Sequence, residues 1–348
     1  MIITLPRFRR NKTYFIRFEA VNTAEMPLLA RGTVVATGQE FLAQGAKSRT
    51  WKYSSKGVTA EETATEAILR SRHAELVFDK GKGLITRYAY KGKDLVDSEF
   101  GIRPNFWRAP VDNDNGNGLP RRAAAWKQAS HEFDAAVSLD GNAMTVIYTL
   151  PQGGTYTVVY TLDRKGILQI HSSLRGGTVP NLELPRLGLR MRLPASADRF
   201  RYYGRGPQEN YWDRYSGTDI SLYEASAEEE CYPYVRPQES GHHIDCTWLA
   251  IGGMTVVADP LFEFNALRCS IEDLDNDPAV KPHRHINDVP VRDYVELCLD
   301  HKMTGVGGYD SWGARPEAGR TLWSDKDYDF NLTFVPGMPL RRILRTNF

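Results

Sequence analysis

Alternation of apolar and polar residues recurs along almost the whole chain. In "TYFIRFEAVN" it puts Tyr14, Ile16 and Phe18 on one face, and it returns in "GTYTVVYTLD", "LGLRMRLP" and "FNLTFVP". Successive side chains of a β-strand point to opposite faces of a sheet, so a period of two predicts half-buried strands. Turn sequences such as "DKGKG" and "LDGN" separate these segments. The pattern therefore predicts an all-β fold built from packed antiparallel sheets.

Helical patterns are rare by comparison. The segment "TAEETATEAILRSRH", residues 59–73, reads as a helix, and a short helix is expected near "PRRAAAWKQAS", residues 120–130. Residues 47–70 are polar and poor in β-branched residues, so we interpret them as a linker. The linker would join a β piece, residues 1–46, to a main domain, residues 71–348. The first piece supplies too few strands for a sandwich that is stable alone.

Composition excludes several classes of protein. The 348 residues carry a formal net charge of +1, which leaves no basic surplus for nucleic acid. The sequence has no apolar run of about 18 residues that could span a membrane, and no feature of it indicates a compartment. The cysteines show no CxxC spacing, so we expect free thiols rather than zinc ligands. They are Cys231, Cys246, Cys269 and Cys298.

Four loops are unusually rich in polar and aromatic residues. They are "FWRAPVDNDNGNG", "YYGRGPQENYWDRYSG", "YPYVRPQESGHHIDCTWL" and "GVGGYDSWGARP". The first resembles part of a calcium loop, but Arg121 and Arg122 follow where a bidentate acid is needed, so a hydrogen-bonded turn is the better interpretation. The first three loops hold the candidate residues Arg108, Asp112, Asn113, Asp114, Glu209, Asn210, Asp213, Arg214 and Glu239.

Two further groups of residues have both a functional and a structural interpretation. Glu209 and Glu239 have the chemistry of a glycosidase carboxylate pair, but each lies among arginines, which favours ion pairs that fix the loops. Four histidines could form a metal cluster, but HH and HxH pairs are common and no third ligand is indicated, so structural or surface roles are favoured. These are His242, His243, His283 and His285.

The fourth loop places Trp312 on a glycine-rich stretch that should be a turn-rich loop rather than a strand. A tryptophan in such a loop is either a lid over its own core or a flat surface offered to a ligand. Sugar rings present apolar C–H faces that stack on tryptophan, and their hydroxyls need Asn, Asp, Glu and Arg. The aromatic and polar loops therefore favour carbohydrate as the ligand.

Together the four loops carry a specific resemblance. "FWRAPVDNDNGNG", "GRGPQENYWDR", "YPYVRPQESGHH" and "GVGGYDSWG" occur in this order in the C-terminal part of the β-galactosidases of glycoside hydrolase family 2, the β-galactosidase small chain. The segment "YFIRFEAVNTAEMPLLARGTVVATGQEFLA" resembles the last strands of the immunoglobulin-like domain that precedes it. The resemblance implies a large antiparallel supersandwich related to galactose mutarotase for residues 71–348, after a short immunoglobulin-like fragment.

The resemblance also implies a division of labour. In the family, a TIM barrel that is not part of this sequence holds the catalytic glutamates and the Mg²⁺ and Na⁺ ions, so no residue here is expected to be catalytic or to bind a metal or cofactor. The enzyme hydrolyses terminal β-galactosides such as lactose with retention. Expected partners are the remaining domains or a large subunit, the galactoside, and further copies of the enzyme. The chain would be a natural small subunit or a piece of a longer polypeptide.

For one residue the resemblance implies contact with substrate. Trp312, with Gly307, Gly308, Asp310 and Ser311 around it, matches the loop that forms an aromatic platform at the active-site mouth. Tyr309 departs from the family's usual small or acidic residue, which affects the expected loop shape.

Two other functions remain open from the sequence. One is a stand-alone epimerase of the mutarotase type that uses His242 or His243 with Glu209. The other is a non-catalytic carbohydrate-binding module.

Overall fold

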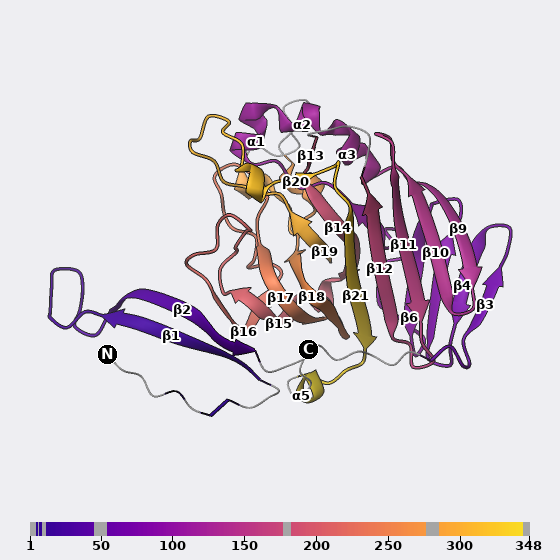
Figure 1. Cartoon of the computed structure of the whole chain (residues 1–348), viewed down its shortest axis with the longest axis horizontal. Helices are drawn as coiled ribbons and strands as arrows, with labels where there is room; N and C mark the ends of the chain where they lie inside the picture. The colour runs from indigo at the N-terminus through magenta and orange to yellow at the C-terminus, as the bar shows by residue number, and fades with distance from the viewer. Residues whose placement is uncertain are drawn as a thin grey trace.

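The computed structural model describes residues 5, 7–8, 12–44, 54–176, 182–275 and 285–343. Strands dominate it, and each of its recorded strand pairings is antiparallel (Figure 1). The all-β, antiparallel class predicted from the period-two pattern is confirmed.

A two-stranded hairpin comes first and stands apart from the rest (Figure 1). It consists of β1 (Thr13–Val21) and β2 (Val34–Gln44), and no residue of β1 is buried. Two hydrogen bonds link the side chain of Gln39 to the backbone of Ile220, at 2.8 and 3.0 Å. Two strands alone bury too little apolar surface to be stable in water. The immunoglobulin-like origin of this hairpin stays a prediction.

A five-stranded sheet follows, and it corrects the helix predicted over residues 59–73. The strand that carries Ala67 and Leu69 is paired on both sides, and both side chains pack into the hydrophobic core, so tertiary structure overrides the helix propensity of Ala, Glu and Leu. The described part of the expected linker, residues 54–70, therefore contains two strands of this sheet. Its strands are β3 (Thr59–Glu62), β4 (Glu66–Arg70), β5 (Ala74–Asp79), β6 (Leu84–Tyr90) and β7 (Lys93–Asp94).

A twelve-stranded sheet forms the main body. Its principal path runs β16-β15-β17-β18-β21-β12-β11-β10-β9, and β19, β14 and β8 branch from β18. A two-stranded pair, β13 (Glu183–Leu184) with β20 (Leu322–Trp323), lies beside it. The twelve strands are β8 (Arg103–Asn105), β9 (Asp134–Asp140), β10 (Ala143–Thr149), β11 (Thr155–Leu162), β12 (Leu168–Arg175), β14 (Arg186–Pro194), β15 (Arg199–Gly206), β16 (Asp219–Ser226), β17 (His242–Ile251), β18 (Met254–Leu267), β19 (Tyr294–Met303) and β21 (Tyr328–Pro336).

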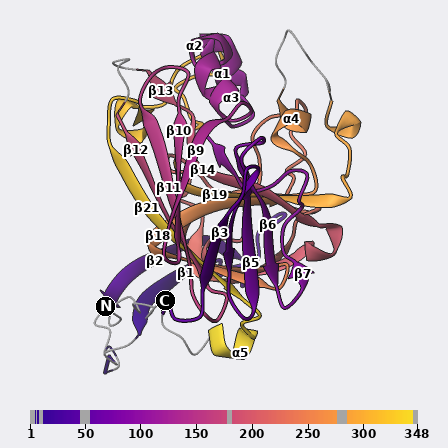
Figure 2. The same cartoon turned by 90° about the vertical axis from the view of Figure 1, so that its right-hand side faces the viewer.

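One hydrophobic core joins the two large sheets. It includes Phe78 and Tyr88 from the five-stranded sheet and Tyr160 and Phe334 from the twelve-stranded sheet. The ring centroids of Tyr88 and Phe334 lie 6.3 Å apart. Figure 2 shows β3 to β7 in front of the strands of the larger sheet. The main body is therefore a sandwich with a continuous core.

Helices are short, and three of them gather at one end of the sheets with β13, β20 and the segment that joins β19 to β20 (Figure 1). The helix predicted near residues 120–130 is confirmed, and Trp126 is its buried anchor. No helix among the described residues is long and apolar enough to cross a membrane. The helices are α1 (Asp112–Asn117), α2 (Leu119–Arg122), α3 (Ala124–Ala129), α4 (Ile271–Leu274) and α5 (Leu340–Ile343), with 3-10 turns η1 (Ala195–Ala197), η2 (Ile286–Asp288) and η3 (Ala318–Arg320).

Candidate functional site

The Trp312 loop, residues 304–320, joins β19 to β20 and presents its aromatic residues to solvent. Trp312 is 88% exposed and Tyr309 is 84% exposed. At the tip, the carboxylate of Asp310 accepts hydrogen bonds from the backbone N–H of Trp312 (2.8 Å) and of Ala314 (3.2 Å). The ring of Trp312 is therefore not a lid over the core of this chain. It is an exposed aromatic surface on a structured turn.

Residues of two other motifs fix the base of this loop. Asp213 accepts hydrogen bonds from the backbone N–H groups of Val306 (3.1 Å) and Gly307 (2.8 Å). The buried guanidinium of Arg108 donates to the carbonyl of Gly305 at 3.1 Å. The second motif, about a hundred residues before the loop, and the first motif, about two hundred residues before it, thus meet at the base of the loop.

Helix α1, from the "DNDNGNG" stretch, supports the tip of the loop. The side-chain amide of Asn113 donates to the carbonyl of Asp310 (2.7 Å) and accepts from the N–H of Gly313 (3.2 Å). Gly116 packs directly on Gly313: a Cβ added at Gly116 would lie 2.9 Å from the Cα of Gly313. Gly313 itself has a φ of +114°, a conformation that L side chains rarely adopt. Both glycines are needed for this close approach.

The acidic residues of the same stretch are engaged with protein groups. Asp114 is buried, pairs with Arg108 at 2.9 Å and accepts from the N–H of Val111 at 2.9 Å. Burial raises the pKa of Asp114, and Arg108 opposes that shift. Asp112 contacts Arg236 of the third motif at 3.4 Å. Within the described residues, no cluster of three or more His, Cys, Asp or Glu could hold a metal ion.

Glu239 lies in the core rather than in a cleft. Its carboxylate pairs with the buried Arg186 at 3.3 Å and accepts from the Asn265 amide (2.9 Å) and the Ala109 N–H (3.3 Å). Arg186 also faces Asp300 at 3.2 Å, and burial raises the pKa of Asp300 well above its ordinary value. The cavity that Glu239 lines has a volume of about 10 Å³, enough for one water molecule and too small for a sugar.

Glu209 is enclosed by its own loop and by the third motif. It pairs with Arg214, and it accepts from the hydroxyls of Tyr211 (3.2 Å) and Tyr234 and from the N–H of Gly241 (2.8 Å). The ion pairs expected for Glu209 and Glu239 are thus present. Neither carboxylate is free to attack or protonate a substrate in this geometry.

The adjacent Asn210 is fully buried. It donates to the carbonyl of Gln208 (2.9 Å) and accepts from the N–H of Ile244 (2.9 Å). It therefore ties the second motif to β17.

The two adjacent histidines are fully buried with partners on both ring nitrogens. His242 contacts Asn265 (2.8 Å) and Glu263 (3.1 Å). His243 contacts Glu230 at 2.8 Å and the Arg205 carbonyl at 3.1 Å. The ring nitrogens of both histidines are engaged with these other partners and not with Glu209, so the geometry required for the epimerase alternative is not formed.

The other histidine pair is divided between two parts of the chain. His285 is exposed at the start of η2, and His283 lies outside the described residues. All four cysteines are free thiols, with the Sγ atoms of Cys231 and Cys269 at 3.8 Å.

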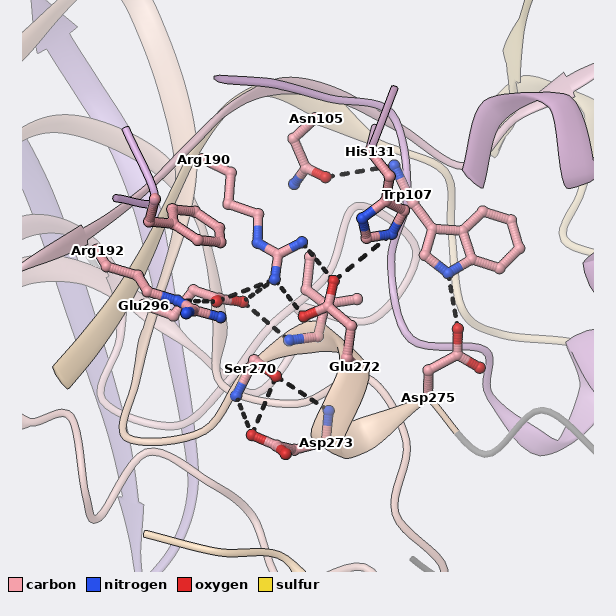
Figure 3. A network of polar contacts seen from close by, with 12 residues as sticks. Asn105, Trp107, His131, Arg190, Arg192, Ser270, Glu272, Asp273, Asp275 and Glu296 are labelled. Carbon is pink, nitrogen blue, oxygen red and sulfur yellow. Dashed lines mark hydrogen bonds and ion pairs between the residues drawn. The ribbon is translucent and has the colours of Figure 1, made fainter. Parts of the chain in front are cut away.

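A second polar network anchors the first motif on its other side (Figure 3). The indole N–H of Trp107 donates to Asp275 at 3.0 Å. Behind it, the buried Arg190 pairs with Glu296 at 2.9 Å and with Glu272, and this pairing holds the pKa of Glu272 well below its ordinary range. These contacts secure α4 against β14 and β19, which is a structural role.

A pocket that the sequence did not predict lies between the limbs of the Trp312 loop. Its volume is about 390 Å³. It is lined by residues 307–309 from one limb and by Arg315, Glu317 and Arg320 from the other. Asp213, Tyr215 and Ser216 complete the lining. The arginines of "GARPEAGR" were the sequence feature that could have indicated this pocket. Charged residues in a loop are usually solvated, however, so they did not single it out.

Known proteins similar to this chain agree with the resemblance that the four motifs carry. Residues 70–334 match the family model described as "Beta galactosidase small chain". The β-galactosidase of Priestia megaterium is 33% identical over 329 residues, which cover 88% of this chain and 30% of that protein. The β-galactosidase of Streptococcus thermophilus is 28% identical over 281 residues, or 77% of this chain and 26% of that protein. The chain thus spans less than a third of the length of these relatives.

Among solved structures, a galactose mutarotase related enzyme from Lactobacillus acidophilus matches with a TM-score of 0.47 at 10% identity, covering 78% of this chain and 97% of that chain. A putative aldose 1-epimerase from Escherichia coli matches with a TM-score of 0.40 at 11% identity, covering 80% and 98%. The family model spans most of the sequence, including all four motifs. The chain therefore belongs to the β-galactosidase small chain family.

Proposed function

We propose that this chain is the C-terminal part of a retaining β-galactosidase of glycoside hydrolase family 2, acting on terminal β-galactosides such as lactose. Family membership supports this proposal, as do relatives that carry the name β-galactosidase and are about three times longer. The chain supplies architecture, a contact with the remaining domains or a large subunit, and one aromatic residue that faces the substrate.

The observation that carries the proposal is the exposed ring of Trp312 on a loop whose backbone is held in place. Tryptophan is the largest apolar side chain, and 88% of it faces solvent although contacts from α1, Asp213 and Arg108 secure the backbone of its loop. An exposed aromatic surface suits the stacking of a flat apolar partner. In our proposal that partner is the leaving-group side of the galactoside.

The chemical step belongs to residues outside this chain. Retaining hydrolysis requires two carboxyl groups about 5–5.5 Å apart, one as acid and base and one as nucleophile. Glu209 and Glu239 are held by arginines and backbone N–H groups, so we assign the step to a TIM barrel elsewhere in the enzyme. The Mg²⁺ and Na⁺ of the resemblance go with that barrel in our proposal.

The test compares the chain alone with the complete enzyme on a chromogenic β-galactoside. The purified chain should show no turnover above buffer, whereas the polypeptide or subunit pair that contains it should be active. Turnover that copurifies with the isolated chain and disappears in Glu239→Gln would contradict the division of labour. It would make Glu239 a catalytic residue.

A further inference from the structure

The pocket between the limbs of the Trp312 loop is a preformed feature. The limbs are closed at their base, where the N–H of Gly305 donates to the carbonyl of Arg320 at 2.8 Å. The N–H of Arg320 in turn donates to the carbonyl of Glu317 at 2.8 Å. Asp213 fixes the start of the loop through two backbone N–H groups. Since the backbone at the base of the loop is held by these bonds, a ligand would mainly have to order the side chains of the lining.

The pocket offers both donors and acceptors to a ligand. The Arg320 guanidinium lies 5.8 Å from the ring centre of Trp212, and it has no hydrogen bond or ion pair with another described side chain. Arg315 is 53% exposed and touches Glu183 only at 3.5 Å. Opposite them, the Tyr309 hydroxyl donates to Glu317 at 3.3 Å. Each of these groups retains capacity for further hydrogen bonds.

The charge and size of the pocket select the class of ligand. Two arginines are balanced by two carboxylates, Asp213 and Glu317, so the lining has no net charge to attract an anion. A ligand with many hydroxyl groups can pair with guanidinium donors and carboxylate acceptors at once. The volume of about 390 Å³ lies in the range of about 300–1,000 Å³ typical of small-molecule pockets.

Its position connects the pocket to Trp312. Tyr309 and Arg315 each lie three residues from Trp312, so their Cα atoms are at most about 11 Å from that of Trp312. Two sugar units of one oligosaccharide can bridge such a distance. The pocket and the platform thus lie on neighbouring segments of one loop.

We propose that this pocket is a second sugar subsite. It binds the neutral hexopyranose that follows the unit stacked on Trp312, so that the enzyme accepts galactosides with leaving groups longer than one sugar. The inference rests on the proposed role of Trp312, and it assigns binding roles to Arg315, Arg320 and Tyr309.

Because residues of this chain line the pocket, the purified chain can serve as the test material. Saturation-transfer NMR should compare lactose with β-galactosyl-(1→4)-cellobiose, which extends the leaving group by one glucose. We expect the terminal glucose to receive saturation and the trisaccharide to bind about five-fold or more tightly, a gain of about 1 kcal/mol. Arg320→Ala and Arg315→Ala should each remove most of that gain. Arg341→Ala, on α5 at the opposite end, should not (Figure 1).

The outcomes separate this inference from the proposed function. Trp312→Ala should weaken the binding of both sugars, whereas the pocket variants should affect only the trisaccharide. Equal binding of the two sugars, no binding of either, or a trisaccharide gain that survives both arginine variants would overturn the pocket assignment. Tighter binding of inorganic sulfate than of the trisaccharide would also overturn it, in favour of an anion site. The proposed function would be contradicted by a different result, namely turnover of the chromogenic β-galactoside by the purified chain alone.

Discussion

Trp312 is the residue whose substitution tests the proposed function most directly. In the complete enzyme, Trp312→Ala should raise the KM for lactose about ten-fold, because stacking on an aromatic side chain contributes about 1–3 kcal/mol. The change in kcat should be smaller, since the ring binds the ground state and the transition state alike. Steady-state kinetics with lactose measure both constants.

Two controls accompany this variant. Trp312→Phe keeps an aromatic face and should retain most of the affinity. In the isolated chain, the melting temperature of Trp312→Ala should be unchanged, because a ring that is 88% exposed there leaves no cavity when it is removed. A lower melting temperature with unaltered lactose kinetics would instead assign Trp312 a structural role.

Whether the partner of a charged residue can be predicted from the sequence depends on how far apart the two residues lie along the chain. Arg108 and Asp114 are six residues apart in one motif, and they pair directly at 2.9 Å. The partner of Glu239 is Arg186, 53 residues away, so an ion pair could be predicted while its partner could not. Such a partner is fixed only when the strands assemble.

At the scale of single elements, the support of the Trp312 loop by α1 is the critical contact. A Cβ at Gly313 would lie 2.7 Å from the carbonyl carbon of Gly116, and the φ of +114° disfavours a side chain. Gly313→Ala should therefore displace the loop and raise the KM for lactose several-fold with Trp312 still present. An effect of about 1 kcal/mol corresponds to about five-fold.

The matched control is Gly319→Ala, three residues before β20. A Cβ there meets nothing within 4 Å, and no left-handed conformation is required. Gly319→Ala should leave the lactose kinetics unaltered. Equal effects of the two alanines would mean that general stiffening of the loop matters, rather than its packing on α1.

The hairpin of β3 and β4 shows why element prediction failed in one place. Ala, Glu and Leu favour a helix in isolation, and residues 59–73 carry many of them. In the folded chain the backbone of this segment pairs with β5, and its side chains Ala67, Ile68 and Leu69 are buried. The strands with strict alternation, such as β11, were predictable because their own pattern separates a buried face from a more accessible one.

For the molecule as a whole, the many alternating segments of the sequence predicted a sandwich of β-sheets. They did not predict the order in which the strands pair. The branch in which β19 pairs with both β18 and β14 depends on contacts between distant segments. The hairpin of β1 and β2 is a different case. Its period-two pattern correctly predicts two strands, but these strands form a sheet of their own and make few contacts with the sandwich. Leu28, Val35 and Phe41 are all exposed there.

Stability of the isolated chain should therefore reside in the sandwich. Among the described residues, the hairpin is attached through the Gln39 side chain and an ion pair of Arg17 with Asp219 at 3.2 Å, and such exposed pairs contribute about 0–1 kcal/mol. Removing residues 1–53 should leave the melting temperature within about 2 °C, the shift that about 1 kcal/mol produces in a domain of this size. Removing residues 1–70 instead takes away β3 and β4 with their buried residues, and it should cost several times more. Calorimetry of the three chains measures this order, and equal losses from both deletions would show that the hairpin is part of the folding unit.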